Sequence, residues 1–576
     1  MRYIPFILEA ARLLTALIRP NHLVGLNSWG LIHLLPPCNS NDFGYNKHSS
    51  AIKFYLFFTP VYLAPLFVAA GDLELKSNIK STAYAYQTEQ KSGVSNDNLA
   101  LVLAPSVTGI YDSKKVDVAV NAIHTLVKQQ DEEAGANKNF TDLTLNSNIN
   151  LIENALNMTV NGSQNYQVVN NSQDFFSDKV LSSGDLKKIQ RYSLALDFSI
   201  PNPDYIGFDL ATAYSDTSAD ETNQQNPGLN GNNTLVSSRI YSARYLSQLT
   251  FDFSAHYNST VRSNFSDFKS TVLSGNVRLE MYEQLKLILQ GSDESYDANL
   301  ENQNSGRTNL DSYSYGAGLA WLNKDNHGIQ LTYNTLVEPN NTTNYIGVDV
   351  NWAFSQRTSL NMNYGKRAYG DAYQLNFQYS LKSFRSSLSY SEDITSYARY
   401  SLISVPLGIF VCSIGSTELI DCFQPGSINY VLQPGEEFRS YDGISTDITN
   451  EVILTKAANY VLGYDKRKLK LSFNLGYRET EYIETNRLQK YTTVGLDALY
   501  RLSRRTNVGV NAKTIRRDGE QKLGTEDTLT VGLNIDRKLS QNASVDAGFR
   551  YLHRSSENES RDVTDKRLTV GFKYQF

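Results

Sequence analysis

The chain has 576 residues, more than a single soluble core usually holds, so either several domains or one very large sheet is expected. Tyr (37) and Phe (25) are frequent, whereas Cys (3), Met (4) and Pro (14) are scarce, a mixture that favours strands and turns. The net charge of -5 arises from charges of both signs interspersed along the chain, which argues against a nucleic-acid partner.

The N-terminal part of the chain differs from the rest. Residues 1–52 show no periodic pattern, and we interpret them as an extension of unknown role, for which a mis-assigned start codon is one explanation. Residues 53–70 form an apolar run that ends in Val-Ala-Ala, the pattern of a secretory signal peptide cleaved near Gly71. A transmembrane helix is the rival interpretation, but two prolines interrupt the run, which is also short for a span. We therefore expect residues 71–576 to form the mature chain.

From Leu73 onward, apolar and polar residues alternate with period two, which is typical of a sheet with one apolar and one polar face. In 192–200, for example, Tyr, Leu, Leu, Phe and Ile occupy the even positions. Counting such segments predicts about 24 strands, within a range of roughly 18 to 26, and the pattern is weakest between residues 98 and 162. Comparable rows occur at 249–257, 273–281, 313–321, 346–354, 373–381, 469–477, 494–502 and 543–551.

The connections between these segments alternate between short and long. Outer-membrane barrels have short periplasmic turns at one rim and long extracellular loops at the other. The longest connection, loop 393–450, contains the apolar stretch 403–411, which is unusual for a solvated loop. Short connections occur at 201–205, 323–327, 355–357, 382–383, 465–467 and 503–505, and long ones at 216–236, 293–311, 335–344, 393–450, 479–490, 516–527 and 554–566.

The last strand gives the most specific evidence for a barrel. Apolar residues alternate with polar ones for ten positions and finish at an aromatic residue. Such a strand resembles the C-terminal signal by which the barrel-assembly machinery recognises outer-membrane proteins, so we expect that machinery to be a partner. The residues of this expected assembly signal are Leu568, Val570, Phe572, Tyr574 and Phe576.

These patterns predict an all-β fold, a large closed antiparallel transmembrane β-barrel in the outer membrane of a Gram-negative bacterium. An unpaired backbone group costs several kcal/mol in hydrocarbon, so a spanning sheet must close. One face would contact outer-membrane lipid and lipopolysaccharide, and the other would line a lumen too wide for side chains alone to fill. An inward fold of loop 393–450 or of segment 163–188 is the expected obstruction. The lumen-facing candidates are Asn361, Asn363, Gln374, Asn376, Gln378, Lys468, Lys470, Asn474, Asn511, Lys513, Asp546, Arg550, Arg567 and Lys573.

Two cysteines remain in the expected mature chain, Cys412 and Cys422, because Cys38 precedes the cleavage site. They stand ten residues apart in the expected external loop. We predict that they form a disulfide in an oxidising compartment, and two unpaired cysteines are the alternative.

The sequence contains no phosphate-binding loop, zinc-protease motif or nucleophile elbow. Its seven histidines are dispersed, which argues against a metal site, and we expect no cofactor. His256, His327 and His553 each have Ser or Asp nearby in sequence, as a rim enzyme would need. Because nothing singles out one constellation among them, we predict no catalytic residues and no enzymatic activity.

The segment from Asn363 to Thr395 carries a family resemblance. It resembles the best-marked stretch of the outer-membrane β-barrel protein family associated with the PEP-CTERM/exosortase sorting system. The resemblance implies a bacterium that makes an exopolysaccharide, with polysaccharide or export-system components as partners. The matching residues are Tyr364-Gly365-Lys366-Arg367, then Gly370, Tyr373, Asn376 and Ser380, and then Ser389-Tyr390-Ser391-Glu392-Asp393-Ile394-Thr395.

Three functions remain open at this point. The first is a porin-like hydrophilic route across the outer membrane, associated with exopolysaccharide production or export. The second is a plugged structural or surface-interaction barrel that acts through its extracellular loops. The third is an outer-membrane rim enzyme, for which the three histidines named above would be the residues to test.

Overall fold

The computed structural model describes only part of the chain. The chain divides into two compact units, Met1–Pro65 and Leu66–Phe576, and all described residues belong to the second. The expected extension and signal peptide lie outside them. Among the described residues, no helix is long and apolar enough to cross a membrane. The described ranges are 71–90, 95–130, 137–168, 180, 186–219, 230–262, 267–298, 310–323, 327–339, 341–355, 357–367, 369–396, 405–413, 422–423, 436–443, 452–482, 487–518, 524–557 and 562–576.

The described residues form one large antiparallel sheet of 24 strands and one small sheet of three. Aromatic and β-branched residues alternate with small polar ones along the strands, which suits a sheet with two different faces. The large sheet contains β1 (Asp72–Gln90), β2 (Ser95–Asp112), β3 (Val116–Gln129), β4 (Asn137–Ile152), β5 (Leu156–Val168), β6 (Leu186–Ser199), β7 (Ile206–Ala219), β8 (Gly231–Ser242), β9 (Leu249–Arg262), β10 (Phe268–Tyr282), β11 (Leu285–Ala298), β12 (Leu310–Leu322), β13 (Gly328–Glu338), β14 (Asn341–Ser355), β15 (Thr358–Arg367), β16 (Gly370–Ser380), β17 (Phe384–Ser396), β21 (Val452–Lys466), β22 (Leu469–Tyr482), β23 (Arg487–Arg501), β24 (Thr506–Asp518), β25 (Thr525–Lys538), β26 (Ala543–Ser556) and β27 (Val563–Gln575). The small sheet contains β18 (Val405–Ser413), β19 (Cys422–Phe423) and β20 (Glu436–Gly443).

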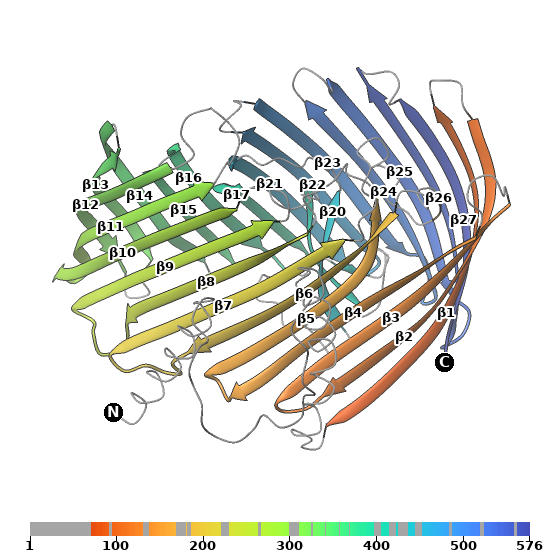
Figure 1. Ribbon diagram of the computed structural model, residues 1–576, viewed down its shortest axis with the longest axis horizontal. Coiled ribbons are helices and arrows are strands. Elements are labelled where there is room, and N and C mark those ends of the chain that lie inside the picture. The colour runs from red at the N-terminus through yellow and green to blue at the C-terminus, as the bar shows by residue number, and fades with distance from the viewer. Residues whose placement is uncertain are drawn as a thin grey trace, which may run out of the picture. The chain divides into compact units, whose positions relative to one another are not determined.

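The large sheet closes on itself as a barrel. Each strand pairs with its neighbours along the chain, and β1 pairs with β27, where Ala83 lies opposite Val570. Strand β17 pairs directly with β21, so the small sheet is an insertion between two wall strands. In Figure 1 the green strands β10–β16 form one side of the barrel wall, and the blue β27 meets the orange β1 on the opposite side. The predicted all-β closed barrel of about 24 strands is therefore confirmed, and β2–β5 occupy the stretch where the alternation is weakest.

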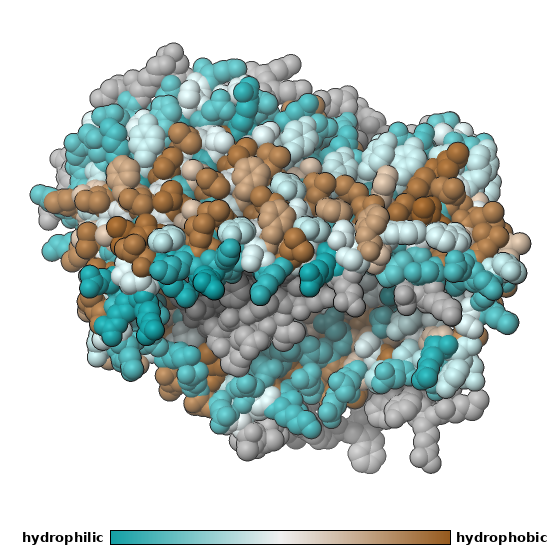
Figure 2. Space-filling model, turned by 180° about the vertical axis from the view of Figure 1, so that it is seen from behind, coloured by the Kyte–Doolittle hydropathy of each residue, from teal (hydrophilic) through white to brown (hydrophobic). Residues whose placement is uncertain are grey.

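The wall has an apolar outer face and a polar inner face. On β27, the side chains of Leu568, Val570 and Phe572 are 44–53% exposed, and opposed residues of antiparallel strands share a face. The register therefore continues this outer face from strand to strand, and Figure 2 shows an apolar belt between hydrophilic zones. The other face is the inner one, because the concave side of the wall brings together strands that are not neighbours, as it does for Arg367 of β15 and Glu294 of β11.

The two ends of the barrel differ in the length of their connections. At the short-turn end, hairpins such as β10–β11 and β16–β17 are joined by two or three residues. At the opposite, long-loop end, 55 residues separate β17 from β21. The long connections expected at 335–344 and 479–490 are shorter than predicted, because β13, β14, β22 and β23 extend further. Loop 393–450 likewise begins inside β17, which continues to Ser396, and it includes the small sheet.

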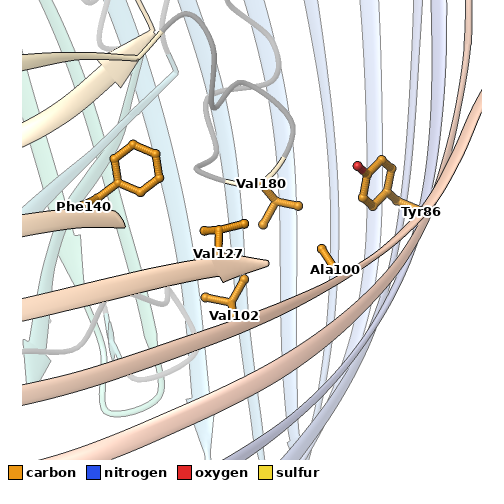
Figure 3. Close-up of a cluster of buried hydrophobic side chains, with 6 residues drawn as sticks. All are labelled: Tyr86, Ala100, Val102, Val127, Phe140 and Val180. Carbon is orange, nitrogen blue, oxygen red and sulfur yellow. The ribbon is translucent and has the colours of Figure 1, made fainter. Parts of the chain in front are cut away.

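An apolar cluster lies inside the barrel at the long-loop end of β1–β4. Tyr86, Val102, Val127 and Phe140 occupy inner-face positions and are buried against one another. Val180, from the connection between β5 and β6, packs on this cluster, and its carbonyl oxygen accepts a hydrogen bond of 2.5 Å from the Gln129 side chain. Figure 3 shows Val180 beside Val127 and Val102. The expected inward fold of segment 163–188 is thus observed at Val180, the one described residue between β5 and β6.

Candidate functional site: the lumen of the barrel

The candidate site is the inner face of the wall, and the register shows which residues form it. Asn363 lies opposite Gln374 and Asn361 opposite Asn376, so all four point to the same side of the sheet. Lys468 differs from the other predicted lumen residues, because it lies in the turn between β21 and β22 rather than in a strand. The register places the remaining candidates, Gln378, Lys470, Asn474, Asn511, Lys513, Asp546, Arg550, Arg567 and Lys573, on the inner face.

The inner face of strands β10–β16, which we call the narrow lobe, is filled by its own side chains. Gln290 of β11 reaches across β12 and donates hydrogen bonds to Thr332 (3.1 Å) and Asn334 (2.8 Å) of β13. The crossing is possible because β12 carries Gly316 and Gly318 at this point, where a Cβ atom would collide with β13. Asn334 is only 1% exposed as a result.

A second contact closes the narrow lobe at the long-loop end. The Arg367 guanidinium of β15 donates hydrogen bonds to the Glu294 carboxylate (2.8 Å) and to the Tyr296 hydroxyl (2.9 Å), both on β11. The Tyr296 hydroxyl also bonds to Glu294 (3.3 Å), and Arg367 lies over the ring of Tyr369 at 5.4 Å. We call these four residues the clasp. Because three strands separate β11 from β15 in the sheet, the clasp spans the inside of the lobe.

Beside the clasp, an apolar cluster links the inner face of the narrow lobe to β17 and β21. Phe268 of β10 and Tyr296 of β11 pack against Ile394 of β17 and Leu454 of β21. Ile394 and Leu454 are opposite each other at outer-face positions, yet both are buried. The long-loop ends of β17 and β21 therefore lean inward, so that their outer face covers the inner face of β10 and β11. Local strand register alone would place these two residues on the outer surface.

Strands β24–β27, which we call the wide wall, carry charged side chains on the inner face. The Glu526 carboxylate lies between Arg517 (2.6 Å) and Arg554 (2.5 Å). The Asp565 carboxylate lies in the same way between two further arginines, at 3.0 Å from Arg550 and 3.3 Å from Arg567. Both carboxylates are buried, and each shared carboxylate offsets part of the repulsion between two neighbouring guanidinium groups.

In the middle of the wide wall, glycines leave room for polar side chains of the next strand to lie against the sheet. Asn534 of β25 lies over Gly509 of β24, and Asn511 of β24 lies over Gly532 of β25. Asp546 of β26 covers Gly571 of β27 in the same way. A polar side chain that lies flat over a neighbouring glycine projects little into the lumen. The middle of the wide wall thus combines polar side chains with little side-chain bulk, whereas the charged groups at Glu526 and Asp565 are packed against one another.

The three histidines named from the sequence stand in separate hydrogen bonds. His256 contacts Ser237 (3.0 Å), and His553 contacts Thr564 (3.0 Å). His327 contacts Asn351 at 3.4 Å. A Ser-His-Asp arrangement needs a carboxylate on the second ring nitrogen, and none of these rings has one among the described residues. Nor does this part of the chain contain a group of three or more His, Cys, Asp or Glu that could hold a metal ion.

The small sheet brings the two predicted disulfide partners together at the level of the backbone. Cys412 of β18 lies directly opposite Cys422 of β19 in the antiparallel register. Opposed residues of antiparallel strands have Cα atoms about 4.5–5.5 Å apart, within the range that a disulfide spans. The register is therefore compatible with the predicted bridge.

Comparisons with known proteins match part of the chain or its fold. A family model described as "Protein of unknown function, DUF481" matches residues 460–576, which form the strands from β21 onward. A search of curated proteins gave no match. Among solved structures, the siderophore receptor PirA from Acinetobacter baumannii is 12% identical, with a TM-score of 0.37, over 87% of this chain and 80% of the receptor. The FrpB iron transporter from Neisseria meningitidis, in its apoprotein form, is 8% identical, with a TM-score of 0.43, over 87% and 81%. The copper transporter OprC is 10% identical, with a TM-score of 0.37, over 87% and 80%.

Proposed function

We propose that the protein spans the outer membrane of a Gram-negative bacterium and gives hydrophilic solutes a route through its lumen. The observation that supports this most directly is the contrast between the two faces of one closed sheet of 24 strands. An apolar outer belt is suited to lipid, and a polar inner face is suited to water. A barrel of this size encloses more space than wall side chains alone fill, and the wide wall keeps its side chains flat against the sheet.

Electrical recording in planar bilayers tests this proposal. The purified mature barrel, shown to be folded by its heat-modifiable gel mobility, should give discrete conductance steps. A variant in which residues 397–451 are replaced by a short turn should conduct at least as well, because β17 already pairs with β21 without the insertion. If both folded proteins are electrically silent, the lumen is not a solute route.

The resemblance of the stretch from Asn363 to Thr395 leads us to propose a link with exopolysaccharide. In that setting the barrel would serve production or export of the polymer, with export-system components as partners. A strain that lacks the protein should then retain polymer in the periplasm, measured as cell-associated against secreted carbohydrate. Unchanged secretion in that strain would separate the protein from this pathway while leaving the conductance result intact.

A plugged barrel that acts through its loops is a second candidate, and Val180 favours it. This residue packs inside the barrel and accepts a hydrogen bond from Gln129, so part of the lumen beside β1–β4 is occupied. If the plug is complete, conductance should appear only after residues 169–185 are shortened. Binding of whole cells to a surface should then depend on the long loops and not on the lumen.

We also propose that the Cys412–Cys422 bridge forms in the mature protein. A maleimide reagent should label the unfolded mature chain only after reduction, because both thiols are consumed in the bridge. A single substitution, Cys412→Ser, should leave Cys422 reactive without reduction. Equal labelling of the unsubstituted chain with and without reductant would show two free thiols instead.

A further inference from the structure

Strands β16 and β17 share the shortest pairing in the described barrel wall. Six opposed pairs join them, from Leu375–Tyr390 to Ser380–Arg385, whereas β15 and β16 share ten and β17 and β21 share thirteen. Toward the long-loop end, Gly370–Gln374 remain paired with β15 and Ser391–Ser396 with β21, but the two segments are not paired with each other. We call this split in the wall the seam.

The inward lean of β17 and β21 explains the seam. Ile394 and Leu454 pack on Phe268 and Tyr296 across the lumen, so the end of β17 moves away from β16, which stays with the narrow lobe. The clasp lies beside this contact, since Tyr296 belongs to both. At the long-loop end, side chains therefore cover the inner face of the narrow lobe, while the wall is split between β16 and β17.

The outer face of β16 at the seam carries one aromatic and one acidic residue, Tyr373 and Asp371, at the border of the apolar belt. Asp371 is opposite Lys366, and their charged groups are 3.8 Å apart. On the outer face, Tyr373 is opposite Tyr364, and the centroids of their rings are 5.0 Å apart. The same row of opposed residues continues through Val348 to Leu331, which is 52% exposed. The row therefore joins the seam to the surface that we assign to lipid.

The inner face at the seam is polar and open. Gln374 occupies an inner-face position on β16, Ser391 occupies the corresponding position on β17, and both are exposed. Backbone groups that lack a strand partner are costly next to hydrocarbon, so the seam requires water or another polar group along its edges. The outer edge of the seam carries aromatic and acidic side chains, its inner edge is polar, and backbone donors and acceptors lie between them. Such a site suits a molecule whose polar group lies next to its apolar part.

We propose that the seam is a lateral portal for a membrane lipid, whose polar headgroup enters the lumen between β16 and β17 while its acyl chains stay in the bilayer. The headgroup would bond to the free edges of Gly370–Gln374 and Ser391–Ser396. This inference rests on the proposed outer-membrane location but not on solute conduction. A barrel with a closed lumen can still admit a headgroup sideways.

Site-specific photo-crosslinking in liposomes tests the portal. The photoreactive amino acid p-benzoylphenylalanine replaces Gln374 at the seam. It replaces Asn361 in a matched control, because Asn361 is also exposed on the inner face but is paired on both sides. Tyr373, on the outer face, serves as the positive control for lipid contact. The vesicles contain radiolabelled phosphatidylglycerol in one arm and labelled lipopolysaccharide in the other.

The expected result is a lipid adduct at positions 373 and 374 and none at 361. The arm that gives the adduct at 374 identifies a phospholipid or a glycolipid as the occupant. An adduct at 373 without one at 374 would overturn the portal, and so would equal labelling at 374 and 361. Conductance of the same samples is recorded separately, so failure of the pore and failure of the portal are distinguishable.

Discussion

The narrow lobe and the wide wall have similar outer faces and different inner faces. In the narrow lobe, inner side chains reach strands that are not neighbours, as Gln290 reaches Asn334 and Arg367 reaches Glu294. In the wide wall, the short ion pairs of Glu526 and Asp565 join adjacent strands, and one longer pair, Asp546 with Lys80 at 3.8 Å, crosses β27. The same alternation therefore builds inner faces with different packing. The size and reach of the inner side chains, together with local curvature, decide which packing forms.

Removing the clasp should have the largest effect on the narrow lobe. Arg367→Ala should destabilise the folded barrel by about 3–5 kcal/mol, because it leaves the Glu294 carboxylate buried without its cation. The measurement is the urea dependence of heat-modifiable gel mobility in detergent. The matched control is Arg239→Ala, which removes an inner-face pair with Asp252 whose side chains are 51% and 28% exposed.

That control should lose less than about 1 kcal/mol, because water screens an exposed pair. In a conducting barrel, Arg367→Ala should also raise the single-channel conductance as the lobe opens. Equal losses for the two variants would mean that the narrow lobe is no more tightly packed than the rest of the lumen.

Substitutions on the outer face should have the same effect in the narrow lobe and in the wide wall, because both outer faces are apolar. Leu331→Arg in the narrow lobe and Val570→Arg in the wide wall both place a charge at an exposed apolar position, 52% exposed in each case. Each should cost about 2–4 kcal/mol near the middle of the bilayer, measured by unfolding from liposomes. A cost at one site only would show that the apolar belt does not continue around the barrel. Thr569→Arg, on the inner face beside Val570, is the control and should be tolerated.

The smallest effect is expected at the glycines that allow the narrow lobe to fill. A Cβ atom on Gly318 would lie 2.6 Å from the Thr332 Cα atom, whereas a Cβ atom on Gly463 of β21 would meet nothing within 4 Å. Gly318→Ala should therefore destabilise by about 1–3 kcal/mol through overpacking. Gly463→Ala should be neutral or slightly stabilising, because alanine loses less backbone entropy in a strand. Similar urea midpoints for both variants would contradict the close approach of β12 and β13.

Several features of the fold could be predicted from the sequence because they depend on local order. Side chains of a strand alternate between two faces whatever the strand pairs with. Leu568, Val570 and Phe572 therefore predict an outer row, and Asn361 and Asn363 predict an inner one. The number of strands follows from counting such rows, and closure follows from the cost of an unpaired edge in lipid. The small sheet was not predicted, because its strands are short and carry little alternation.

The tertiary structure alone decided what happens inside the barrel. Arg367 and Glu294 are 73 residues apart in the chain, and no periodic pattern relates them. Ile394 and Leu454 hold outer-face positions and are nevertheless buried, because the ends of β17 and β21 lean across the lumen. Alternation specifies the face of each residue relative to its own strand. The curvature of the sheet, which the packing of distant strands sets, decides whether that face meets water, lipid or another part of the wall.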